Sequence, residues 1–99
     1  MANKIYKYSE WQGANGYWHV AHTDNMKLNR WWMAPQALGI SYEQYIQMLK
    51  EQYHVSHIKF YTYHDARNSF LSFSFEKYAD AHRYLLDINK VFRKLNWTY

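Results

Sequence analysis

Two stretches of alternating, strand-like sequence, each followed by a stretch with helical spacing, constrain the fold of this chain most strongly. Residues 4–23 hold two runs rich in Tyr, Trp, Ile and Val, and the segment between them, Gly13-Ala14-Asn15-Gly16, tolerates the positive φ of a tight turn. Residues 55–75 hold a second pair of runs, separated by His64-Asp65-Ala66-Arg67-Asn68, whose Asp and Asn are typical of turns. The pattern predicts two β-hairpins.

Each predicted hairpin precedes a predicted amphipathic helix. Ser41 and Gln44 match a capping box, which places the start of the first helix, residues 41–54, near Ser41. The second helix is predicted over residues 76–95, where acidic residues come early and basic residues come late, as the helix dipole favours. The apolar stripe of the first helix holds Tyr42, Tyr45, Ile46, Leu49 and Tyr53, and that of the second holds Ala81, Leu85, Ile88, Phe92 and Leu95.

These elements predict one α+β domain over residues 1–99. We expect a two-layer ββα-ββα pseudo-repeat, in which a four-stranded antiparallel sheet carries two helices packed on one face. A gapped alignment of the two halves sets Tyr8 on Tyr61 and favours equivalent hairpins. Lys59 and Tyr61 are expected to face outward, and the core side of the last strand is expected to hold Leu71, Phe73 and Phe75.

The residue types that many catalytic and secreted proteins need are missing. The chain has no cysteine and three glycines, which excludes disulfides, thiolate chemistry and Gly-rich phosphate loops. A metal site would have to combine distant residues such as His22, His57 and His64 with Asp24 or Asp65. We therefore expect no metal, no cofactor and no enzymatic activity, with a metal-dependent hydrolase as the third hypothesis.

Charge and hydropathy limit the cellular compartment and the class of partner that we expect. Twelve Lys and Arg against eight Asp and Glu give a formal net charge of +4, which favours polyanionic partners. No run of 18 apolar residues is present, and the start of the chain lacks the apolar stretch of a signal peptide. Together with the absence of cysteine, this predicts a cytoplasmic protein that does not associate with membranes.

The long insertion between the first hairpin and its helix, residues 24–40, has the most unusual composition. Trp and Arg are enriched at interface hot spots, and adjacent tryptophans in an extended segment cannot both enter one core. We therefore predict a non-enzymatic binding module whose partner is a protein or a protein–nucleic acid complex. The alternatives are that the tryptophans plug the core, or that the same surfaces form a homodimer. The predicted contact residues are Lys27, Arg30, Trp31, Trp32 and Met33.

Direct nucleic-acid binding is the second hypothesis. Rings and positive charge on an open sheet face form a stacking platform for single-stranded nucleic acids. Arg93 and Lys94, near the end of the chain, would add positive charge. The predicted platform residues are Tyr6, Tyr8, Lys59, Tyr61 and Tyr63.

A short segment before the first helix also resembles the turn of a helix-turn-helix. In this interpretation Gly39 ends a short helix, which Pro35 limits to about one turn, and the helix at 41–54 reads a DNA groove. The acidic Glu43 and Glu51 on the outward side of that helix disfavour the interpretation. Gly39 is more simply explained as a C-cap.

In size, lack of cysteine and heavy use of Tyr and Trp, the chain resembles the small accessory proteins of bacteriophages and mobile elements, including inhibitors of host defence such as anti-CRISPR proteins. The resemblance is one of composition and assigns no residue. It implies an inhibitor that acts in the bacterial host cytoplasm. Many such inhibitors are acidic DNA mimics, and the net charge of +4 departs from that pattern. The resemblance therefore implies contact with a host protein or nucleoprotein, for example a defence nuclease.

Overall fold

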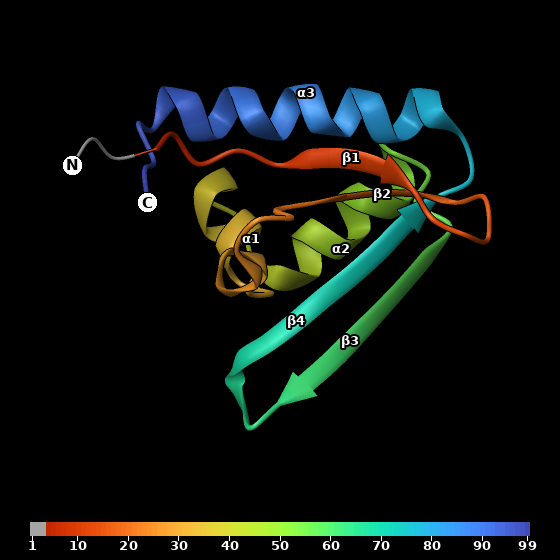
Figure 1. Ribbon diagram of the computed structural model, residues 1–99. Coiled ribbons are helices and arrows are strands. Elements are labelled where there is room, and N and C mark those ends of the chain that lie inside the picture. Colours follow the sequence, from red (N-terminus) through yellow and green to blue (C-terminus); the bar gives the residue numbers. More distant parts are fainter. Residues whose placement is uncertain (1–3) are drawn as a thin grey trace.

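Four strands form one antiparallel sheet in the order β1-β2-β4-β3, with helices packed against it (Figure 1). The computed structural model describes residues 4–99, apart from the side chain of Tyr63. The strands are β1 (Ser9–Gln12), β2 (Trp18–Ala21), β3 (His57–Tyr63) and β4 (Asp65–Phe75). The helices are a 3-10 turn, η1 (Met26–Asn29), and three α-helices, α1 (Met33–Leu38), α2 (Tyr42–Glu51) and α3 (Tyr78–Lys94). The predicted α+β fold with a four-stranded antiparallel sheet is confirmed.

The two hairpins turn in different ways. In the first, the Gly13 N–H donates to the Tyr17 carbonyl at 2.8 Å and Gly16 has a φ of +88°, as the turn chemistry predicted. In the second, β4 begins at Asp65, and His64 makes the turn with a φ of +62°. The predicted five-residue turn over 64–68 is therefore wrong. Asp65 to Asn68 extend the strand instead.

The helices begin and end where local chemistry satisfies their backbones. The Ser41 hydroxyl accepts from the Gln44 N–H at 3.1 Å, and the Gln44 side chain accepts from the Ser41 N–H at 2.9 Å, so the capping box is confirmed. The insertion is not a loop throughout, because it contains η1 and α1. Pro35 lies in the first turn of α1, where a missing N–H costs nothing, and Gly39 ends the helix with a φ of +70°.

The core lies between the sheet and the helices, and it includes two tyrosines that were expected on the other face. Tyr6 and Tyr8 are 2% and 6% exposed. Their rings pack against Phe92 of α3, with centroids 4.3 and 5.1 Å away. The Asn89 side chain fixes this orientation, since it accepts from the Tyr8 N–H at 2.7 Å and donates to the Tyr8 carbonyl at 3.0 Å. The alignment of Tyr8 with Tyr61 is therefore wrong, because Tyr61 is exposed.

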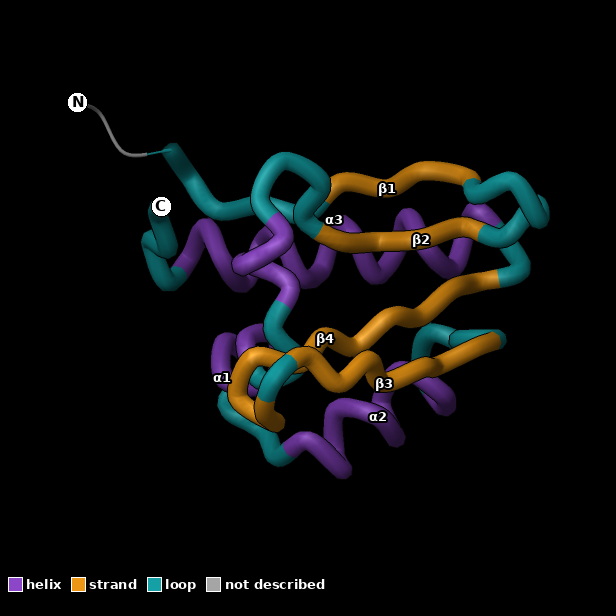
Figure 2. Tube along the Cα trace, turned by 60° about the horizontal axis from the view of Figure 1, so that its bottom comes forward, coloured by secondary structure: helices purple, strands orange, loops and turns teal. Residues whose placement is uncertain are grey.

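The second hairpin follows the predicted alternation near the core, whereas Phe60, on the same side as Leu71, is 42% exposed. Phe73 and Phe75 are buried, whereas Lys59 and Tyr61 are exposed. Among the described residues, the two hairpins pair only at Trp18↔Phe75 and His19↔Ser74 and then separate, as Figure 2 shows for β2 and β4. Within residues 4–99, no helix has both the length and the apolar character needed to cross a membrane.

Candidate nucleic-acid interface

The sheet face opposite the helices carries rings and positive charge. Cross-strand pairing sets Trp11 beside His19 and Tyr61 beside Phe70. Trp11 and Tyr61 are 40% and 48% exposed. We call this surface the open face, and we define it by Trp11, His19, His57, Lys59, Tyr61, Phe70, Ser72 and Ser74. None of these residues is acidic, although the next pair of the same ladder, at the turn end of the hairpin, includes Asp65.

Ring contacts hold several of these side chains in place. The Trp11 and His19 rings stack with centroids 5.4 Å apart and planes 18° apart. The Lys59 ammonium lies 4.8 Å from the Tyr61 ring centroid, and the Arg30 guanidinium lies 4.8 Å from that of Phe70. Each of these two cations therefore lies over an aromatic ring of the open face.

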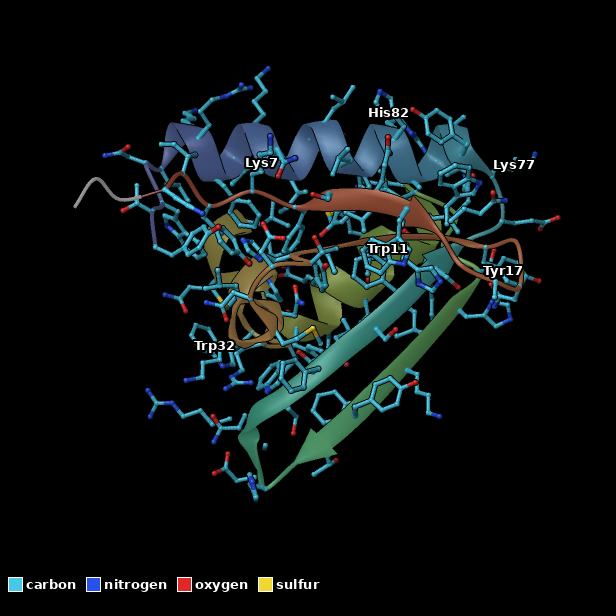
Figure 3. The ribbon with its side chains drawn as sticks, viewed as in Figure 1. Lys7, Trp11, Tyr17, Trp32, Lys77 and His82 are labelled. Carbon is cyan, nitrogen blue, oxygen red and sulfur yellow. The ribbon has the colours of Figure 1, made fainter. Side chains whose placement is uncertain are left out.

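A cleft of about 370 Å³ opens where the two hairpins separate. Trp11, His19 and Ala21 line one side, and Figure 3 shows Trp11 in this region between the hairpins. The insertion closes the far end, where Met26 and Asn29 lie. The opposite side of this hairpin cleft consists of Tyr61, Phe70, Leu71, Ser72 and Phe73.

The far end of the hairpin cleft is tied to both hairpins. The Asn29 side chain accepts from the His22 N–H at 2.8 Å and donates to the His22 carbonyl at 2.7 Å. The Trp31 backbone N–H donates to the Ser69 carbonyl at 3.1 Å. The insertion therefore occupies the place beside β4 that a longer β2 would have taken.

The two tryptophans of the insertion form hydrogen bonds to the second hairpin. The Trp31 indole N–H donates to the Ala66 carbonyl, and the Trp32 indole N–H donates to the Arg67 carbonyl at 3.0 Å. Both side chains are half-buried. Together with Gln36 and Arg67, they line a shallow hollow of about 550 Å³, which lies near Trp32 in Figure 3.

The remaining predicted contact residues of the insertion do not form one surface. Lys27 is exposed on η1, Met33 packs against the core, and Arg30 reaches the open face.

The residues predicted to bind nucleic acid do not lie on one surface either. Lys59 and Tyr61 share the open face, while Arg93 and Lys94 lie in the last turn of α3, on the opposite side of the sheet.

Tyr6 and Tyr8 are in the core, and the side chain of Tyr63 lies outside the described part of the structure. Sequence reasoning missed Trp11, His19 and Phe70. The available signal for the first two was their symmetric placement about the Gly13–Gly16 turn, which makes them cross-strand neighbours.

The histidines have structural partners. His22 is 4% exposed, its Nδ1 accepts from the Asn25 N–H at 3.1 Å, and its ring stacks on Tyr6. Burial lowers the pKa of His22, and the nearby Asp24 carboxylate acts in the opposite direction. Across residues 4–99, no three His, Asp or Glu side chains converge as a metal site would require.

No model of a known protein family matches this chain, and no match was found among curated proteins or solved structures.

Proposed function

We propose that this chain is a non-enzymatic binding module that holds an extended single-stranded nucleic acid across its open face. One observation carries the proposal: exposed rings and cations lie side by side on this face, and none of the residues that define it is acidic. Base stacking on such rings contributes roughly 1–3 kcal/mol per base. Lys59 and Arg30 would contact the phosphates of the bound strand.

The exposure of the rings favours a single strand over a duplex. In a duplex, the faces of the bases are stacked on one another and only their edges are accessible. Trp11 and Tyr61 present ring surface on a sheet, and unstacked bases are the groups that fit such a surface. We therefore expect little preference for sequence and a strong dependence on salt.

Fluorescence anisotropy with a labelled oligothymidylate of about 12 nucleotides, within the usual size range of such sites, tests the proposal. We expect binding at low salt that weakens as salt is added, and weaker binding of a duplex of equal length. Tyr61→Ala should weaken binding by about 10-fold, as the loss of one stacked base predicts.

Two charge reversals provide a matched comparison. Lys59→Glu should weaken binding strongly, whereas Lys90→Glu, at an exposed position on α3, should have a much smaller effect. Equal effects of the two variants would mean that the affinity depends on the net charge and not on where the charge lies. Absence of any binding at low salt would refute the proposal.

A protein partner at the insertion is the second candidate, and the hollow beside Trp31 and Trp32 favours it. It would suit an inhibitor that engages a host nucleoprotein, the class that the composition resembles. A photo-crosslinking residue at Gln36, in the hollow, should then capture one specific protein in cells, and the same residue at Lys90 should not. Capture at both positions or at neither would count against this candidate.

A further inference from the structure

We infer that the hairpin cleft accepts one base of the bound strand, while neighbouring bases stack on the open face. This inference rests on the proposed function and assigns a separate role to the cleft. Its basis is the shape of the cleft, the polar groups in its walls and the charges at its rim.

The shape of the cleft fits a single flat group. The β2–β4 pairing closes one end at His19↔Ser74, and the insertion closes the other at Asn29. Between these ends β4 contributes only residues 70–73, a length of about 13 Å at roughly 3.3 Å per residue. A peptide strand could not run through so short a slit. A volume of about 370 Å³ nevertheless leaves room for one aromatic ring system.

The walls combine apolar surface with hydrogen-bonding groups. The Ser69 carbonyl accepts from Trp31 of the insertion, and the Ser74 carbonyl accepts from Ser56 on the β3 side, so strand alternation turns the carbonyl of Leu71 toward β2. The hydroxyls of Thr23 and Ser72 belong to residues that also line the cleft. A nucleobase has apolar faces and polar edges, so it could pack in the cleft and also bond to the polar groups of its walls. An inserted Leu or Phe side chain would leave those wall groups without partners.

The positive charges at the rim of the cleft favour binding of an anionic chain. The Lys59 ammonium and the Arg30 guanidinium each lie 4.8 Å from a ring that lines the cleft, Tyr61 and Phe70 respectively. The described residues that line the cleft include no Asp or Glu. A base held in the cleft would therefore place its flanking phosphates near cations and away from carboxylates.

Filling the cleft tests the inference. Ala21→Phe places a ring in the cleft, and Ser9→Phe is the matched control, because Ser9 is the cross-strand partner of Ala21 and does not line the cleft. We expect Ala21→Phe to weaken binding of the oligothymidylate by about 10-fold, the effect of one lost base contact. Its affinity for an abasic chain of the same length should not change. Ser9→Phe should weaken neither affinity.

The outcomes separate this inference from the proposed function. If the wild type binds the oligothymidylate and Ala21→Phe binds it equally well, the cleft does not accept a base, although the open face remains the site. Equal weakening toward the abasic chain would also overturn the inference. So would self-association that Ala21→Phe abolishes, since a second copy would then occupy the cleft.

If the wild type binds no oligonucleotide, the proposed function itself fails, and the inference fails with it. Circular dichroism checks the fold of each variant. Ser72→Phe, on the opposite wall, repeats the test should Ala21→Phe not fold.

Discussion

His22 joins three parts of the chain through its buried ring. Its Nδ1 accepts from the Asn25 N–H, and its ring lies between those of Tyr6 and Tyr99 at centroid distances of 5.6 and 4.9 Å. Burial keeps the pKa of His22 below its usual value of 6.5, so the unfolded chain binds this proton more tightly than the folded protein does. The stability that His22 contributes is therefore fully present above the unfolded pKa and is lost as the pH falls through the lower folded pKa.

Urea unfolding at about pH 7.5 and at about pH 5.5, on either side of the ordinary histidine pKa, measures this effect. The wild type should lose stability at the lower pH. His22→Asn keeps an acceptor for the Asn25 N–H but does not titrate, and it should lose less. An equal loss in both proteins would assign the pH dependence to other groups.

The hydroxyls of Tyr45 and Tyr84 form a buried pair 2.6 Å apart, and both residues are 1% exposed. Tyr45→Phe removes one partner of this bond and should cost roughly 1–3 kcal/mol of unfolding free energy. Tyr45→Phe with Tyr84→Phe should cost less than the sum of the two single changes, as measured in a urea double-mutant cycle. Additive costs would mean that the hydroxyls do not depend on each other.

Among elements, the β3–β4 hairpin depends on residues that are far from it in sequence. Replacing Trp31 and Trp32 by Phe keeps two rings and removes both indole bonds to the Ala66 and Arg67 carbonyls. We expect amide hydrogen exchange to accelerate near residues 65–68 and to stay unchanged in α3. Trp11→Phe, in the first hairpin, is the control. Unchanged exchange near the turn would show that the indoles are not needed to hold the strand.

Elements determined by neighbouring residues were predictable, and those determined by distant residues were not. The capping box of α2 and the Gly13–Gly16 turn are local, and both were found from sequence. The extended start of β4 was missed because partners of its carbonyls lie 35 residues away. The orientation of Tyr8 depends on Asn89, 81 residues away, so local alternation could not determine which face it occupies.

The candidate site shows the same division. Lys59 and Tyr61 were placed correctly because strand alternation is local. The hairpin cleft could not have been predicted, because it results from the early separation of β2 and β4.

For the whole molecule, the distribution of charge matters more than its total. If Lys59 contacts a phosphate, Lys59→Gln should reduce the slope of log affinity against log salt by about 0.7, the value for one contact to a single strand. Lys90→Gln makes the same change in net charge on the opposite side and should leave the slope near its wild-type value. Equal slopes for the two variants would place the bound strand elsewhere.

The backbone N–H and carbonyl groups of Lys4 and Tyr99 form two hydrogen bonds with each other, at 3.0 and 2.9 Å. The two ends of the described chain therefore lie side by side. A short linker between these residues would allow the polypeptide to be opened at the exposed Asn15–Gly16 turn with every strand pairing kept. Such a circular permutant would carry its new ends at the turn of the first hairpin. A fluorophore or fused domain attached there would report from a different side of the molecule than one attached at Lys4.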